Sequence, residues 1–132
     1  MSSAPKPKIV IVEDNEALAE IYRVRLEVQG YDCIVASDGA KAIEVIEREQ
    51  PYLVLLDLMI PVLSGDEVLR TIRGNDWGKD IKVQIISNLN ETEAPDDLRE
   101  YGIEGYSVKA NLNDDDIDNI VAGIVGVQPA VD

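Results

Sequence analysis

Histidine is absent from this chain of 132 residues. Its absence excludes Ser-His-Asp and Cys-His nucleophilic sites and removes the commonest zinc ligand. The chain therefore cannot donate a phosphoryl group from a phosphohistidine, although it can still receive one. Cysteine is almost as scarce, because Cys33 stands alone in an apolar stretch. An internal disulfide is excluded, and a buried thiol in a reducing cytosol is expected.

Basic side chains are few, with 12 Lys and Arg against 26 Asp and Glu, which gives a formal charge of −14. Such a surface repels phosphate backbones and anionic lipid headgroups, so direct binding to nucleic acid or membranes is not expected. Long hydrophobic runs are also missing. The longest, Tyr52–Leu63, is interrupted by Asp57 and Pro61 and is too short to span a bilayer. Because the polar start of the chain also lacks a signal-peptide core, we predict a soluble, cytoplasmic protein.

The length fits one ordinary domain with a real hydrophobic core and leaves no room for a second catalytic or DNA-reading domain. The polar segment with Pro5 and Pro7 predicts a flexible tail over residues 1–7. The expected domain covers residues 8–126, and residues 127–132 form a second tail. A stand-alone domain is the primary prediction, and a fragment of a longer protein is the alternative.

Continuous apolar runs at Ile9–Val12 and Tyr52–Leu56 are typical of strands buried on both faces of a parallel sheet. Shorter strands are predicted over residues 33–36, 81–87 and 106–108. Between and after the strands, helical spacing places these apolar residues inward: Ala17, Ile21, Val24 and Val28; Ala42, Ile43 and Ile46; Val68, Leu69 and Ile72; Ala94, Leu98 and Tyr101; Ile117, Ile120, Val121 and Ile124. Five βα units predict an α/β fold, a doubly wound parallel sheet in a three-layer sandwich.

Helix boundaries are also marked in the sequence. Ser64–Glu67 has the S-x-x-E pattern of a capping box and predicts the start of the third helix. Gly30, Pro51 and Gly74 are expected to end the first three helices. Lys82 and Gln84 interrupt the fourth strand, and a buried Gln84 needs hydrogen-bond partners.

Five residues that can carry chemistry lie at or just after the carboxyl ends of predicted strands, and they should converge on one cleft: Glu13, Asp14, Asp57, Ser87 and Lys109. Three carboxylates held together repel one another unless a cation neutralises them. Oxygen ligands without Cys or His favour a hard ion such as Mg²⁺. With an opposing lysine and a hydroxyl donor, these are the groups that a carboxylate needs to accept a phosphoryl group.

Each residue alone also has a simpler interpretation. Glu13 and Asp14 can cap the first helix. Ser87 and Lys109 can be an ordinary loop hydroxyl and a solvated charge. Asp57 fits a cap poorly because Leu-Met-Ile-Pro follows it rather than a helix start. The coincidence of all five at strand ends favours a shared site.

The motifs that carry a family resemblance are Lys8–Asn15, Leu55–Gly65, Ile85–Ser87 and Gly105–Lys109. In order and spacing they resemble the receiver domain of bacterial two-component response regulators, the CheY-like family, over nearly the whole chain. The resemblance implies a flavodoxin-like (βα)5 fold with strand order 2-1-3-4-5.

The resemblance also implies a role in phosphorelay signal transduction. Asp57 would be phosphorylated by a sensor histidine kinase or a phosphotransfer protein. Glu13, Asp14, Asp57 and the Met59 carbonyl would hold Mg²⁺. The protein would not be an enzyme beyond catalysing its own phosphoryl transfer and dephosphorylation.

By the same resemblance, Ser87 would hydrogen-bond the phosphoryl group and Lys109 would pair with it, while Ser87 and Tyr106 would act as the switch. The output would be phosphorylation-dependent binding of a downstream effector protein. Two positions depart from the family pattern: Asn88 replaces a small residue and Ala110 replaces a proline. Because a cis bond before a non-proline residue costs about 2.5–4 kcal/mol, we predict a trans Lys109–Ala110 bond.

Other functions are kept as rivals. A pseudo-receiver would bind partners without being phosphorylated, and a receiver fragment of a longer transcriptional regulator is the other alternative that the resemblance allows. An aspartyl-phosphate phosphatase would carry a second Asp where this chain has Met59, and a flavodoxin-like FMN carrier would meet repulsion from Glu13 and Asp14. From Ala110 to the end the chain has five Asp and no Lys or Arg, which predicts a monomer.

Overall fold

The computed structural model describes residues 5–126, which form a parallel sheet between two layers of helices. The strands are β1 (Lys8–Val12), β2 (Asp32–Ala36), β3 (Leu53–Leu56), β4 (Lys82–Ser87) and β5 (Gly105–Val108). The α-helices are α1 (Glu16–Val28), α2 (Gly39–Glu49), α3 (Gly65–Arg73) and α4 (Asp114–Val125). Four short 3-10 helices cover Asp76–Gly78, Glu91–Glu93, Leu98–Tyr101 and Lys109–Asn111. Part of the expected tail, residues 1–4, and all of 127–132 lie outside the described residues.

The sheet has the order β2-β1-β3-β4-β5, and every pair of neighbouring strands is parallel. The fold class and the strand order 2-1-3-4-5 are therefore confirmed. The chain leaves β1 toward β2 on one side and returns to β3 on the other. In such sheets ligands bind outside the carboxyl ends of the strands at this reversal. The fold thus places a crevice where Glu13, Asp14 and Asp57 follow β1 and β3.

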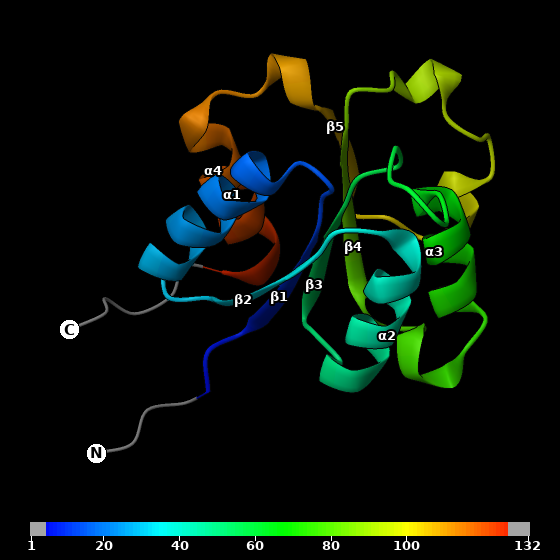
Figure 1. The fold of residues 1–132 in the computed structure, drawn as a ribbon, viewed down its shortest axis with the longest axis horizontal. Coiled ribbons are helices and arrows are strands. Elements are labelled where there is room, and N and C mark those ends of the chain that lie inside the picture. The colour runs from blue at the N-terminus through cyan, green and yellow to red at the C-terminus, as the bar shows by residue number, and fades with distance from the viewer. Residues whose placement is uncertain (1–4, 127–132) are drawn as a thin grey trace.

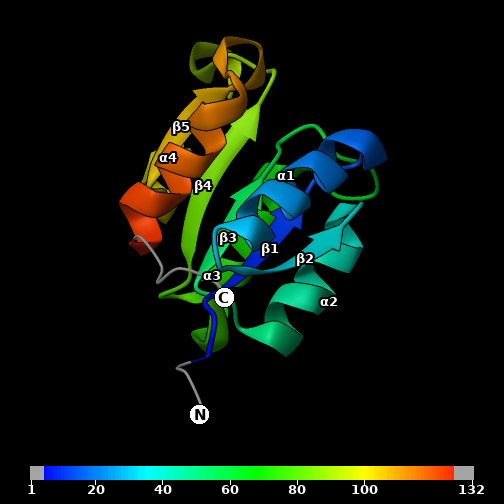
Figure 2. The same ribbon diagram turned by 90° about the vertical axis from the view of Figure 1, so that its left-hand side faces the viewer.

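Helices α1 and α4 cover one face of the sheet, and α2 and α3 cover the other (Figure 1). Figure 2, turned by 90°, shows α1 and α4 in front of the strands. Alternate residues of β1 face the two helical layers. Ile9 and Ile11 pack with the α1 and α4 side, whereas Val10 and Val12 pack with the α2 and α3 side. Burial on both faces explains why the strands read as continuous apolar runs.

The inward face predicted for α1 is wrong. All four residues of that face are exposed: Ala17, Ile21, Val24 and Val28. Ala19 and Leu26 are buried against the sheet instead. The helix carries two apolar stripes, and the register between α1 and the sheet selects the one that contains Leu26. The faces predicted for α2, α3 and α4 include buried Ala42, Ile72 and Val121, as expected.

The α-helix expected around Ala94, Leu98 and Tyr101 is absent, and two short 3-10 helices connect β4 to β5 instead. Pro95 is the physical reason. A residue before proline is pushed out of the α region, and Ala94 is extended, with φ −76° and ψ 159°. Ala94 and Leu98 are still buried in the core. The apolar spacing therefore predicted their burial correctly, but the α-helix that it predicted is wrong.

The hydrogen bonds of Ser64 and Gln84 test two smaller predictions. Ser64 is the N-cap of α3, but its hydroxyl donates to Glu67 at 3.2 Å and makes no capping bond to the backbone, so the predicted capping box is incomplete. Gln84 is buried as anticipated, and its side-chain amide donates to the Ser107 hydroxyl at 3.2 Å.

Cys33 is buried, as expected, and burial raises the pKa of its thiol to about 12. Of the described helices, none joins the length and the apolar composition needed to cross a membrane.

Candidate functional site

Three carboxylates meet at the carboxyl ends of β1 and β3. Glu13 and Asp14 follow β1 directly, Asp57 follows β3, and these two strands are hydrogen-bonded neighbours. One carboxylate oxygen from each residue lies within 4.8 Å of the others. Glu13 and Asp57 are 3% and 4% exposed, and Asp14 is exposed. The structure thus forms a partly buried acidic cluster with one side open to solvent.

Lys109 follows β5 and reaches across to this cluster. Its ammonium nitrogen lies 2.5 Å from Glu13 Oε1 and 2.5 Å from Asp57 Oδ2. Burial acts to lower the pKa of Lys109, but the hydrogen bonds to Asp57 and Glu13 outweigh it, and the pKa is raised. The lysine is therefore a fixed positive charge at neutral pH. It holds one oxygen of each buried carboxylate.

Backbone amides hold the other oxygen of each buried carboxylate. Asn15 N donates to Glu13 Oε2 at 3.0 Å, and Met59 N donates to Asp57 Oδ1 at 2.9 Å. Burial raises the pKa of Glu13 despite the opposing hydrogen bonds from Lys109 and Asn15. Among residues 5–126, no partner forms a hydrogen bond or ion pair with the Asp14 carboxylate. Asp14 therefore has the most available oxygens in the cluster.

Ser87 and Tyr106 lie on neighbouring strands, and both bond to the backbone of Leu89. Ser87 ends β4 and is fully buried, and its hydroxyl accepts from Leu89 N at 3.3 Å. The Tyr106 hydroxyl, from β5, donates to Leu89 O at 2.5 Å. Neither hydroxyl bonds to Asp57 or Lys109 in this structure. The loop at Leu89 links the two side chains to each other.

The Lys109–Ala110 peptide bond is trans, as predicted. The bond lies within the 3-10 helix Lys109–Asn111, which leads toward α4. With Ala110 in place of proline, Lys109 still makes direct contact with Asp57. A side-chain and backbone capping box of Asn113 and Asp116, which sequence reasoning missed, begins α4.

Tyr22 is a further residue of the site that sequence reasoning missed. It lies on the covered face of α1 and lines a cavity of about 10 Å³ together with Glu13 and Asp57. Burial raises the pKa of Tyr22. The charge of Lys109 acts to lower this pKa, and the charges of Glu13 and Asp57 act to raise it. The signal was its spacing with Ala19 and Leu26, the buried stripe of α1.

The loop between Asp57 and α3 contains a strained residue. Val62 has φ 74°, a left-handed conformation that is unfavourable for a β-branched side chain. Around it, Leu63 N donates to Pro61 O at 2.9 Å in a tight turn. Val62 is 74% exposed, so little burial offsets the strain.

We therefore expect Val62→Asn to raise the free energy of unfolding by about 1 kcal/mol, because asparagine tolerates this conformation. Urea denaturation measures the change. Val28→Asn is the control, since Val28 is 72% exposed on a regular helix, and it should change stability by less than about 0.5 kcal/mol. A Val62 variant that is no more stable than the parent would show that the turn stores no strain.

A family model for the response regulator receiver domain matches residues 9–122. The chain belongs to the response regulator receiver domain family, with a CheY-like fold. A probable transcriptional regulator, ycf27, from Porphyridium aerugineum is 35% identical over 104 residues, which are 79% of this chain and 42% of that protein. The chain thus spans less than half the length of this relative.

Solved structures agree with the family. The signal receiver domain of a putative LuxO repressor protein from Vibrio parahaemolyticus is 32% identical with a TM-score of 0.80, covering 89% of this chain and 88% of that chain. The receiver domain of a sensor histidine kinase from Pseudomonas aeruginosa is 23% identical with a TM-score of 0.76, covering 92% and 99%. That second structure has a magnesium ion coordinated in its active site cleft.

Proposed function

We propose that this receiver domain accepts a phosphoryl group on Asp57 from a phosphohistidine of a sensor histidine kinase or phosphotransfer protein. The observation that best supports this proposal is the surroundings of Asp57. Its buried carboxylate bonds to Lys109 and lies within 4.8 Å of two more carboxylates. A carboxylate oxygen attacks phosphorus while the bond to the histidine nitrogen breaks, giving an aspartyl phosphate. The donor histidine belongs to the partner, since this chain has none.

The donor set suits Mg²⁺, because it offers only hard oxygens and Asp14 keeps its carboxylate free. Glu13, Asp14, Asp57 and the Met59 carbonyl would hold the ion. When bound, Mg²⁺ neutralises the charge that gathers on the phosphoryl oxygens. Lys109 would pair with the phosphoryl group, and the Ser87 hydroxyl would donate to it.

Access for the donor is supported by a pocket of about 280 Å³ between α1 and α4 that opens beside Lys109. Ile21 and Leu112 line it, and Ile21 is 51% exposed. An apolar rim next to a charged centre suits a protein donor that must exclude water during transfer.

The change from the unphosphorylated to the phosphorylated conformation would depend on loss of the hydrogen bonds that link Ser87 and Tyr106 to Leu89. If the Ser87 side chain rotates to donate to a phosphoryl oxygen, its hydroxyl oxygen moves away from Leu89 N, and the Tyr106 bond to Leu89 O is then free to change. A downstream effector protein would bind the rearranged surface. The domain catalyses only its own phosphoryl transfer and dephosphorylation, in the cytoplasm, with residues 8–126 as the functional unit.

Incubation with acetyl phosphate, with and without Mg²⁺, tests this function by intact mass. The wild type should gain one phosphoryl group only with Mg²⁺, and Asp57→Asn should gain none. Asp32→Asn is a matched control, because Asp32 is exposed and begins β2, at the end of the sheet opposite to Asp57. A wild type that stays unmodified with Mg²⁺ would favour a pseudo-receiver that binds partners without phosphorylation.

The phosphoryl group should be long-lived for a receiver domain. Family lifetimes depend on the residues two places after the acceptor and two after the conserved hydroxyl, here Met59 and Leu89. These apolar side chains cannot orient an attacking water. Met59→Asn together with Leu89→Glu should speed hydrolysis by about tenfold or more, followed by the decay of the phosphorylated mass. An unchanged decay rate in the double variant would reject this explanation.

We also propose that the domain is a monomer in both states. Dimers in DNA-binding relatives use the helix before the fifth strand, the fifth strand and the last helix, and here the first of these is replaced by 3-10 turns. The first turn of α4 holds Asp114, Asp115 and Asp116, which would repel across a two-fold axis. Sedimentation of the phosphorylated and unmodified protein should give monomers, and a phosphorylation-dependent dimer would contradict the charge argument.

A further inference from the structure

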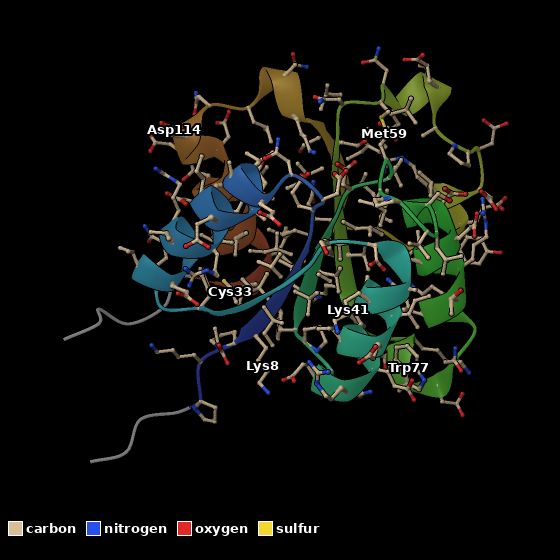
Figure 3. All side chains as sticks on the ribbon, viewed as in Figure 1. Lys8, Cys33, Lys41, Met59, Trp77 and Asp114 are labelled. Carbon is tan, nitrogen blue, oxygen red and sulfur yellow. The ribbon has the colours of Figure 1, made fainter. Side chains whose placement is uncertain are left out.

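A second pocket lies at the edge of the sheet opposite to Asp57. It has a volume of about 620 Å³ and is formed where β1, β3 and β4 begin. Lys8 is the first residue of β1, Tyr52 precedes β3, and Lys82 is the first residue of β4. Figure 3 shows Lys8 and Trp77 at this lower end, far from Met59 near the phosphoryl site. The proposed phosphorelay function gives this pocket no role.

The pocket gathers lysines that the rest of the protein does not neutralise. Among the described lysines, only Lys6, Lys41 and Lys82 have no carboxylate within ion-pair distance. Lys6 and Lys82 both line this pocket. Lys8 is the third lysine there, and it bonds to Glu49 at 2.9 Å. In a chain with a formal charge of −14, two uncommitted cations in one pocket mark a place where an anion is favourable.

Aromatic rings form part of the wall of the same pocket. Tyr52 is 46% exposed, and the Lys82 ammonium lies 5.9 Å from the centre of its ring. Trp77, the only tryptophan of the chain, is half-buried and lines the pocket as well. Exposed aromatic faces next to cations stack well with planar, electron-rich ligand rings. The lining therefore offers ring contacts and phosphate contacts within one site.

The two acidic residues of the pocket, Asp76 and Asp80, indicate which other groups the ligand carries. Asp76 is engaged by Lys79 at 2.9 Å, whereas Asp80 has no ion pair among the described residues. A free carboxylate accepts hydrogen bonds from hydroxyl or amino groups and repels a phosphate placed against it. The ligand should thus carry its negative charge at one end and donors at the other.

We propose that this pocket binds a mononucleotide, a ligand with a planar base, ribose hydroxyls and a phosphate. The base stacks on Tyr52 and Trp77, the phosphate pairs with Lys6 and Lys82, and Asp80 accepts from ribose hydroxyls. The volume lies within the range of about 300–1,000 Å³ that is usual for small-molecule sites.

A small anion suits this surface better than an acidic protein or peptide. A larger polyanion would extend beyond the pocket onto a surface with a strong excess of carboxylates. A mononucleotide meets only the groups within about one Debye length, roughly 8 Å at physiological salt, where the lysines gather. An acidic partner is therefore the alternative that the experiment must distinguish.

Trp77 provides the readout, since it is the only tryptophan. The full chain is titrated with AMP, GMP, CMP and UMP, and tryptophan fluorescence is followed beside isothermal titration calorimetry, which ligand absorbance does not affect. At least one nucleotide should quench Trp77 saturably and give the same dissociation constant by calorimetry. Its nucleoside and inorganic phosphate should each bind at least about tenfold more weakly, because each carries only part of the recognised chemistry.

Lys82→Gln should weaken nucleotide binding about fivefold to tenfold by removing one charge-assisted contact. Lys41→Gln is the matched control, because Lys41 also lacks an ion pair but lies on α2 outside the pocket, and it should leave the affinity unchanged. Three results would each overturn the proposal: no binding of any nucleotide at millimolar concentration, equal binding by the Lys82 variant, or quenching only by a poly-glutamate peptide. Phosphorylation by acetyl phosphate is measured on the same samples, so failure here is separate from failure of the Asp57 site.

Discussion

Gly65→Ala should lower the free energy of unfolding by about 2–3 kcal/mol and should also impair phosphorylation. A Cβ at residue 65 would lie 2.3 Å from the Asp57 carbonyl oxygen and 2.6 Å from Leu58 Cα. Both atoms belong to the backbone, so no side chain can rotate away to make room. Gly65 N also donates to Leu58 O at 3.0 Å, which fixes α3 against the strand end that carries Asp57. Relief of the clash must therefore shift the start of α3 and the backbone at Asp57 relative to each other.

Urea denaturation and acetyl phosphate labelling measure the two consequences of the Gly65 substitution. Gly123→Ala is the matched control, because Gly123 lies inside α4 with no atom within 4 Å of the added Cβ. That change should raise stability by about 0.5–1 kcal/mol through helix propensity and leave phosphorylation unchanged. If Gly65→Ala proved as stable and as active as the parent, the close packing of α3 on Asp57 would be unimportant for the site.

Asp14→Ala should reduce Mg²⁺-dependent phosphorylation roughly a hundredfold or more. Glu13 and Asp57 each give one oxygen to Lys109 and the other to a backbone amide, so Asp14 is the carboxylate with free oxygens. Removing it should not destabilise the fold, because three carboxylates within 4.8 Å repel one another. Lost activity with equal or higher stability is the signature of a metal ligand rather than of a structural residue.

The rate of labelling by acetyl phosphate over a range of Mg²⁺ concentrations measures this effect, with thermal unfolding measured in parallel. Glu16→Ala removes a carboxylate that is exposed two residues further along and serves as the charge-matched control. It should leave the Mg²⁺ dependence in place. Full labelling of the Asp14 variant at the same Mg²⁺ concentration would remove Asp14 from the site.

The sheet was predictable because strands buried on both faces leave unambiguous apolar runs. Ile9–Val12 and Leu53–Leu56 could be recognised without tertiary information. Helix α1 was harder, because one stripe contains Ile21 and the other contains Leu26, and both satisfy helical spacing. Only the packing of α1 onto the sheet decides between them. A local signal, Pro95, was present for the missing helix but was outweighed by the apolar spacing of its neighbours.

The positions of the site residues followed from topology, since carboxyl ends of parallel strands meet at one edge. The sequence therefore indicated that Glu13, Asp14, Asp57 and Lys109 would meet. It could not indicate how hydrogen bonds divide the oxygens among partners, which depends on backbone direction after each strand. Tyr22 was missed for the same reason as the inward face of α1. The pocket at Lys82 was invisible because its walls come from the starts of three strands far apart in the chain.

The most direct test of the account is the chemical identity of residue 57 after phosphorylation. The protein is treated with acetyl phosphate and Mg²⁺, reduced with borohydride, which converts an aspartyl phosphate to homoserine, and digested for tandem mass spectrometry. Homoserine is expected at position 57 with Mg²⁺, and unmodified aspartate is expected when the metal is chelated. Unmodified Asp57 in protein that has gained a phosphoryl group elsewhere, or no phosphoryl group at all with Mg²⁺ present, would contradict it.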